Sequence, residues 1–238
     1  VLIAMLFVSC TKSRLDIDVS DIELQASVYR FDKVIFETKT ENTIQILKDK
    51  YAQHQPFIDL YTEEIIRIGN VENEKFDYFL KHFTTDTVIA QVADEVMLKF
   101  IDFTPIQQRL EEGLKHFRYY FPSKELPGIY TYVSGFNQSM VVAEQFIGIN
   151  LDKYLGSDCI FYQYLGIPQY KIQKMYPQKI ISDFFYALAI TEFPNTDPVD
   201  NLLSNMIYQG KMIYFTEAMN PDTPDSVLIG YSGNQLNW

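Results

Sequence analysis

Cysteine and histidine are scarce in this sequence, and their scarcity excludes several kinds of site. The 238 residues include two cysteines and three histidines. Disulfide frameworks and thiolate zinc sites need several cysteines, so neither is expected. A zinc-peptidase helix needs two histidines at positions i and i+4, but no histidine follows His116. A glycine-rich phosphate loop is also missing. We therefore expect no metal and no other cofactor.

Long runs of basic residues are missing as well. The formal net charge is −11, and no stretch of consecutive lysines and arginines reaches four residues. Nucleic-acid binding draws most of its affinity from neutralising phosphates, so this composition argues against it. The same negative charge disfavours direct adhesion of the globular part to an anionic membrane.

The N-terminus carries an uncharged apolar run that ends at a cysteine. The stretch VLIAMLFVSC is too short to span a bilayer, which needs about 20 apolar residues as a helix. It fits the apolar part of a secretory signal, which is about 7–15 residues long. FVSC resembles a bacterial lipobox, with Ser9 before the cleavage site and Cys10 as the lipidated residue. We expect residues 1–10 to be the end of a truncated lipoprotein signal. The alternative is a buried N-terminal strand that ends in cysteine.

Acyl chains on Cys10 would hold the protein at a membrane, because each buried methylene contributes about 0.8 kcal/mol. Residues 11–20 are expected to be a short tether. The segment from Thr11 to Arg14 carries no acidic export signal, which favours a periplasm-facing lipoprotein of the cell envelope. The aspartates of LDIDVSD lack the glycine and the distant glutamate of a calcium loop, so a solvated tether explains them better.

Helical spacing of apolar residues dominates the first half of the chain. Before it, partial alternation in IELQASVYRF predicts a strand that ends near Phe36. Thr104, Pro105 and Gln107 supply an N-cap, a proline and a capping-box partner for a helix that runs to about Tyr120. The other helices predicted here cover residues 43–56, 57–68, 74–83 and 87–101.

The middle of the chain is rich in β-formers. The expected strands are Ile129–Ser134, Ser139–Ala143 and Phe146–Asn150. Gly135–Asn137 separates the first two strands at the length of a hairpin loop. This spacing predicts a small antiparallel sheet.

Helices are expected again over residues 178–190 and 201–219. A capping-box pattern at Ser232 and Gln235 stands just before Trp238, which suggests a helix cut off in a fragment truncated at its C-terminus. We expect residues 21–238 to form a single α+β domain, predominantly helical with a small antiparallel sheet in the middle of the chain.

Three residues of the second half raise questions of their own. Gly210 lies in an apolar stripe of the helix expected over residues 201–219, where a glycine costs about 1 kcal/mol relative to alanine. Close approach of another backbone is the expected compensation. Lys211 flanks the stripe, and either extends to water or is a buried cation that contacts a carboxylate. Cys159 is expected to pack as a small hydrophobic residue.

Several longer stretches resemble one known family. They are YRFDKVIFE, NLDKYLGSDCIFY, GIPQYKIQKMYPQKIISDFF, NLLSNMIYQGKMIYFTEAMNP and IGYSGNQLNW. In this order, and together with the lipobox, they resemble the gliding-motility lipoprotein GldB family of Bacteroidota. The resemblance implies an envelope lipoprotein required for gliding motility and type IX protein secretion, with a degenerate metallopeptidase-like fold that lacks the zinc motif. One departure is IQKM at Ile172–Met175, which is less basic than the family's stretch.

The resemblance implies no catalytic residue, so we expect an accessory protein rather than an enzyme. Aromatic residues are enriched at interaction hot spots, and the loop Cys159–Tyr176 is rich in them. We expect an interaction surface for envelope proteins or a ligand at Tyr154, Asp158, Phe161, Tyr162, Tyr170, Lys211, Tyr231 and Gln235. The alternative is that these rings fill the core. A periplasmic ligand-binding lipoprotein, or a hydrolase whose active site is not recognisable in this fragment, also stays open.

Overall fold

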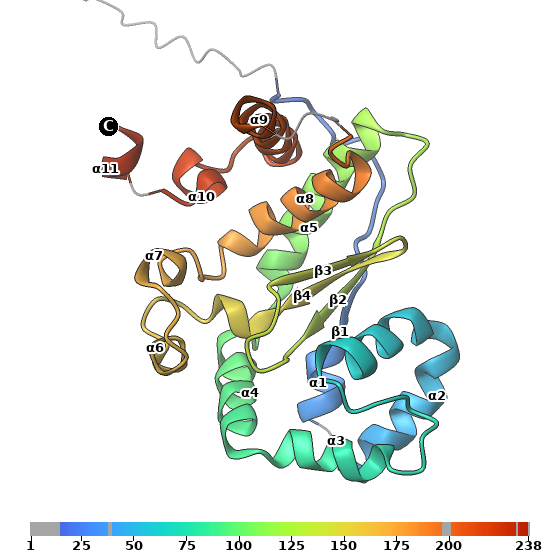
Figure 1. Ribbon diagram of the computed structural model, residues 1–238. Coiled ribbons are helices and arrows are strands. Elements are labelled where there is room, and N and C mark those ends of the chain that lie inside the picture. The colour runs from blue at the N-terminus through green and yellow to red at the C-terminus, as the bar shows by residue number, and fades with distance from the viewer. Residues whose placement is uncertain (1–14, 38–39, 197–200, 232, 238) are drawn as a thin grey trace, which may run out of the picture.

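The computed structural model describes residues 15–37, 40–196, 201–231 and 233–237 (Figure 1). The first elements are β1 (Val28–Arg30), α1 (Phe31–Phe36), α2 (Thr40–Asp59), the π-helix η1 (Leu60–Ile65), α3 (Phe76–Thr85), α4 (Thr87–Lys99) and α5 (Thr104–Tyr120). The later ones are β2 (Gly128–Tyr132), β3 (Met140–Ala143), β4 (Phe146–Asn150), the 3₁₀-helix η2 (Leu151–Tyr154), α6 (Ile160–Tyr164), α7 (Gln169–Ile172), α8 (Lys179–Glu192), α9 (Leu202–Met219), α10 (Asp225–Ile229) and α11 (Gly233–Leu236). The prediction of a mostly helical α+β protein is confirmed. No helix within the described ranges is long and apolar enough to cross a membrane.

The strands form one mixed sheet in the order β1-β2-β4-β3. Both β1 and β4 pair in parallel with β2, whereas β3 pairs antiparallel with β4. The predicted antiparallel sheet is therefore wrong. The predicted hairpin across Gly135–Asn137 is also wrong, because β4 lies between β2 and β3. The hairpin of this sheet joins β3 to β4 through Glu144 and Gln145. Every residue of β4 is buried, as is usual for a strand covered on both faces.

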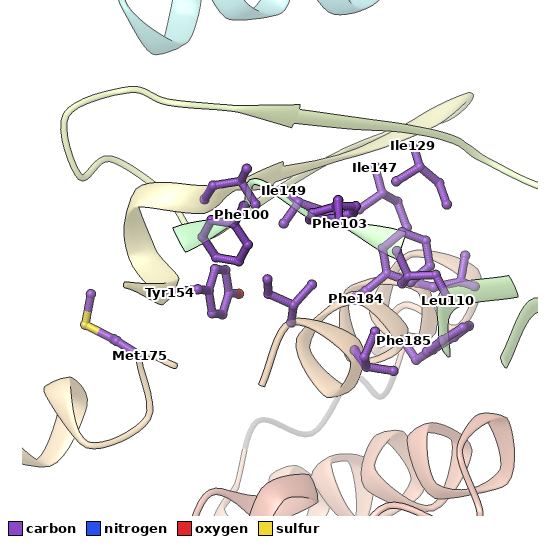
Figure 2. Packing of buried hydrophobic residues seen from close by; sticks show 14 of the residues in the cluster. Phe100, Phe103, Leu110, Ile129, Ile147, Ile149, Tyr154, Met175, Phe184 and Phe185 are labelled. Carbon is purple, nitrogen blue, oxygen red and sulfur yellow. The ribbon is translucent and has the colours of Figure 1, made fainter. Parts of the chain in front are cut away.

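Two hydrophobic cores lie on opposite faces of the sheet. Ile129, Ile147 and Ile149 face the larger core, which α4, α5, α8 and α9 complete. Figure 2 shows these isoleucines directly against the aromatic rings of the helices and their connections. On the other face, Tyr132 and Phe146 pack with residues of α1, α2, η1 and α3. Figure 1 shows the same layering, with α8 and α9 on one side of the sheet and α1 to α3 on the other.

The N-terminal part differs from the sequence-based expectation. Only Val28–Arg30 is a strand, and a helix begins at Phe31 instead of the strand continuing to Phe36. The reason is that Phe31 and Ile35 are one helical turn apart and both are buried against the smaller core. Within the predicted tether of residues 11–20, Leu15 and Val19 are buried. The described part of that segment is thus packed against the domain.

Helix α5 ends where predicted, but its start is organised differently. Its N-cap is Phe103, which makes no side-chain cap bond. The predicted capping box at Thr104 is therefore wrong. The amide of Gln107 donates to the carbonyl of Ala26 at 2.8 Å, which ties the helix to the segment before β1. Asp102 accepts the N–H of Thr104 instead, at 2.9 Å.

Candidate interaction surface

A shallow hollow lies between the end of α4 and the start of α6. Its volume is about 430 Å³, and the residues that line it are Glu95, Leu98, Lys99, Leu155, Asp158, Cys159 and Ile160. Leu98 is 74% exposed, and Ile160 on the other wall is also exposed. Charged side chains of both signs surround these two apolar groups, as at the rim of a protein interface.

Apolar exposure continues from this hollow along α6 and α7. Ile160 and Tyr164 are four residues apart on α6 and therefore share one face. Tyr164 is 81% exposed, and Leu165 and Tyr170 are exposed as well. Figure 1 shows α6 and α7 standing out from the body of the domain beside α4. We call Leu98, Ile160, Tyr164, Leu165 and Tyr170 the α6–α7 surface.

The opposite side of α6 anchors this surface in the core. Phe161 and Tyr162 are buried, so these two candidate residues belong to the core and their prediction as surface residues is wrong. The hydroxyl of Tyr162 donates to the carbonyl of Asp152 at 2.8 Å and accepts the N–H of Leu155 at 2.9 Å. Burial raises the pKa of Tyr162 above its ordinary value. These two hydrogen bonds fix the position of α6 on the domain.

Tyr154 is a second candidate that the structure places inside. Its side chain is buried, and its hydroxyl donates to Asp183 Oδ2 at 2.9 Å. Asp183 also pairs with Lys179, at 2.6 Å between Oδ1 and Nζ. Burial, and then the charge of Asp183, raise the pKa of Tyr154. The predicted surface role is therefore wrong, and Tyr154 instead ties η2 to α8.

Gly156 and Asp158 form the turn that leads into α6. Gly156 has a φ of +117°, a conformation that favours glycine. A Cβ at this position would lie 2.7 Å from Asp158 Oδ1 and 3.7 Å from Lys99 Nζ. The N–H of Gly156 donates to the carbonyl of Met175 at 2.9 Å, so the two ends of the aromatic loop are tied together. Asp158 is exposed beside Lys99, as a surface role requires.

Cys159 forms part of the wall of the hollow but faces the larger core. It is buried, so the prediction of a packed hydrophobic residue is confirmed. Burial is the main cause that raises the pKa of its thiol, and the nearby carboxylate of Glu95 adds to the shift. The Sγ atom lies 3.9 Å from Glu95 Oε2. A thiol with a raised pKa is a poor nucleophile at neutral pH.

The remaining candidates are exposed but do not form one site. Tyr231 packs its ring against Lys174, whose Nζ lies 4.7 Å from the ring centroid. Gln235 is exposed on α11. Lys211 is exposed on α9. It therefore extends to water and is not a buried cation, which was the other interpretation of its position. Figure 1 places α9 far from α6, and Lys211 is therefore not part of the α6–α7 surface.

Gly210 does not have the close neighbour that its position suggested. Apart from its own helix backbone, no atom of the described residues lies within 4 Å of a Cβ built there. The expected backbone approach is wrong. Such an approach occurs instead at Gly113 of α5, where a Cβ would lie 2.4 Å from the ring of Phe185 and 3.0 Å from the carbonyl oxygen of Met219.

Sequence reasoning missed Leu98, although a signal for its exposure was present. Val92, Val96 and Phe100 repeat every four residues along α4 and its end, and all three are buried. Leu98 lies off this stripe, on the far side of the helix. An apolar residue off the buried stripe of an amphipathic helix indicates an exposed apolar contact.

A buried carboxylate explains why residues 134–137 do not form the expected hairpin. Asp152 Oδ2 accepts three backbone N–H groups, from Ser134 at 2.8 Å, Gly135 at 2.9 Å and Phe136 at 3.1 Å. Asp152 is fully buried, and burial raises its pKa to about 6 despite these bonds. Its Oδ1 has no hydrogen-bond partner among the described residues. With no exposed atom, this carboxylate holds the loop rather than meeting a substrate.

No group of three or more His, Cys, Asp or Glu side chains in the described ranges is placed to hold a metal ion. Cys10 and Ser232 lie outside the described residues, so lipidation of Cys10 stays a prediction.

Comparison with known proteins identifies one family. The model of the family described as gliding motility protein GldB matches residues 12–238 of the chain. No curated protein and no solved structure matches the chain. The metallopeptidase-like origin of the fold therefore stays a prediction.

Proposed function

Because the chain belongs to the gliding motility protein GldB family, we propose that it is a lipid-anchored accessory protein of the cell envelope. In this proposal it supports gliding motility and type IX protein secretion by binding other envelope proteins, and it catalyses no reaction. The family match supports a lipoprotein associated with gliding motility. The α6–α7 surface is the observation that carries the proposal of protein binding.

The α6–α7 surface has the composition of a protein-binding site. Tyrosine combines a large apolar area with a hydroxyl that tolerates water, and it is enriched at interaction hot spots. Tyr164 and Tyr170 are exposed, and exposed leucine and isoleucine side chains accompany them. Lys99 and Asp158 supply charges at the rim of the neighbouring hollow. An apolar surface rimmed by charges favours a protein partner over a small ligand.

The surface is also preorganised, which favours affinity. The buried side of α6 is fixed by Tyr162, and the loop ends are tied through Gly156 and Met175. A partner that binds Tyr164 therefore does not have to order the backbone, and little conformational entropy is lost. Anchoring through Cys10 would add to this effect, because confinement at a membrane raises the effective concentration for envelope partners.

The proposal is tested by deleting the gene in its host and measuring colony spreading and the amount of secreted protein. The deletion is then complemented with the wild type, with Cys10→Ala, and with a variant of the surface, Tyr164→Asp. The matched control is Tyr78→Asp, because Tyr78 is also an exposed tyrosine on a short helix but lies on α3. Protein levels in the envelope are compared by immunoblot.

We expect the wild type and the Tyr78 variant to restore both outputs, and the other two variants to restore neither. A photo-crosslinking residue at position 164 should then capture an envelope protein that the same residue at position 78 does not. Spreading and secretion that survive the deletion would contradict the proposed function. Full rescue by Tyr164→Asp would contradict the α6–α7 surface alone.

A further inference from the structure

Helix α9 carries apolar side chains on two opposite faces. Its inner face packs into the larger core through Met212, Phe215 and Met219. Its outer face is exposed and consists of Leu202, Leu203, Met206, Ile207 and Tyr214, which we call the α9 face. The spacing of three, four and seven residues places these side chains on one side of the helix. Leu202 is 77% exposed, and Gly210 lies open to solvent in the middle of the face. A helix that is apolar all round is normally covered on all sides.

The α9 face also differs from the rest of the protein in charge. The chain holds 31 acidic residues and has a net charge of −11. From Leu202 to Thr216, however, α9 contains no aspartate or glutamate, and Lys211 is the single charged residue of that stretch. Glu217 follows in the last turn of the helix, three residues after Tyr214. The argument from net charge against membrane contact is therefore weaker for the stretch from Leu202 to Thr216 than for the rest of the surface. A lysine beside exposed leucine and methionine suits the boundary between lipid headgroups and acyl chains.

The N-terminal segment reaches the domain beside this face. Leu15 and Ile17 line a groove of about 990 Å³ together with Ile207, Lys211 and Tyr214 of α9. Figure 1 likewise shows the first described residues next to α9. Tyr119 and Tyr120 of α5 line the same groove, and such rings are enriched at headgroup level in membrane proteins.

The distance to the proposed anchor is short. Cys10 precedes Leu15 by five residues. Five residues span at most about 18 Å when fully extended. Acyl chains on Cys10 would therefore enter a bilayer within about 18 Å of Leu15, which itself lines the groove under α9.

We propose that the α9 face lies on the bilayer that receives the acyl chains of Cys10. This contact rests on the lipid anchor of the proposed function and adds a second point of attachment. Because the anchor already confines the domain, the second contact forms within one molecule and needs little affinity of its own. Two points of attachment restrict rotation of the domain. Figure 1 shows α3 at the opposite end from α9, so α3 would point away from the membrane.

The test measures the depth of two positions in reconstituted vesicles. The full-length acylated protein is inserted into vesicles of phosphatidylethanolamine and phosphatidylglycerol. A polarity-sensitive fluorophore is attached at Ile207→Cys on the α9 face or at Tyr78→Cys on α3. The two native residues are similarly exposed, at 51% and 62%, so neither label disturbs the core. The native Cys159 is buried and does not compete for the label.

We expect the fluorophore at position 207 to shift to the blue and to be quenched several-fold more strongly by nitroxide-labelled lipids than the one at position 78. Adding Leu203→Glu and Met206→Glu should abolish the difference while the protein still floats with the vesicles. Equal quenching in protein that floats would overturn the contact and leave the anchored function standing. A blue shift at position 207 that grows with protein concentration without vesicles would assign the face to a second copy and overturn the proposal. Protein that does not float would overturn both the anchor and the contact.

Discussion

Arg30 and Asp32 form an ion pair where β1 passes into α1, with Arg30 Nη2 2.6 Å from Asp32 Oδ2. The carboxylate of Asp32 is buried and also accepts the hydroxyl of Thr131 on β2. Arg30 donates to the carbonyl of Phe100 at 3.0 Å and lies over the ring of Phe103. Through these contacts Arg30 and Asp32 join β1, β2 and the connection from α4 to α5.

Replacing Arg30 with alanine should lower the free energy of unfolding by about 3–5 kcal/mol, because it leaves a buried carboxylate without its cation. The matched control is Lys33→Ala, which removes the surface pair of Lys33 with Glu37 and should cost less than about 1 kcal/mol. Urea unfolding of both variants measures the difference. Equal losses would show that the Arg30 pair contributes no more than a surface pair.

Two helical glycines should respond oppositely to alanine. Gly113→Ala should destabilise the protein by about 1–3 kcal/mol, because the new Cβ meets the ring of Phe185. Gly210→Ala should stabilise it by about 1 kcal/mol, since its site is open and alanine is the better helix former. Thermal unfolding of the two variants checks the signs. A loss of stability in Gly210→Ala would indicate that another molecule or segment approaches α9 there.

Asp152 should make stability depend on pH. Its pKa is raised by burial from an ordinary value of 3.8 to about 6 in the folded state. The folded protein then binds this proton more tightly than the unfolded chain does, so the contribution is full below pH 3.8 and is lost as pH rises through 6. This shift in the pKa of Asp152 corresponds to about 3 kcal/mol in the free energy of unfolding.

The measurement for Asp152 is the free energy of unfolding of the wild type minus that of Asp152→Asn at several pH values. The asparagine oxygen can still accept the loop N–H groups but does not ionise. The difference should fall by about 3 kcal/mol between pH 3 and pH 7. A difference that stays constant would mean that Asp152 keeps its ordinary pKa.

Neighbouring tyrosines of α6 should separate stability from function. Tyr162→Phe removes the buried hydroxyl that bonds Leu155 and Asp152, and should cost about 1–3 kcal/mol. Tyr164→Asp changes an exposed ring and should alter stability by less than about 0.5 kcal/mol. Unfolding curves set beside colony spreading test this pair. A Tyr164→Asp protein that is strongly destabilised would show that its ring packs in the fold.

Local features were predictable because their causes are local. Helix α9 begins where the sequence indicates, since Asn201 caps it by accepting the N–H of Ser204 at 2.9 Å. Apolar periodicity over residues 87–101 placed α4 correctly. The burial of Cys159 was predictable because a lone cysteine without a disulfide, metal or catalytic partner behaves as a small hydrophobic residue. The family could also be read from the order of the motifs, which the match over residues 12–238 confirms.

The candidate surface was only partly predictable. A tyrosine has the same sequence signature whether its ring fills the core or faces a partner, so Tyr154 and Tyr162 were placed outside while Tyr170 was placed correctly. The order of the strands was not predictable, because pairing joins segments distant in the chain. Here the buried carboxylate of Asp152 draws residues 134–136 into a loop and leaves β4 to pair with β2.

By itself the sequence determined most of the longer helices, the three β-rich runs in the middle of the chain and the family, since each depends on neighbouring residues or on their order. Only the tertiary structure decided which apolar faces are covered. Periodicity shows that α9 has an apolar face, whereas exposure depends on what packs against it. The exposure of the α9 face, and the position of the segment that begins at Leu15 beside it, therefore follow from the tertiary structure alone.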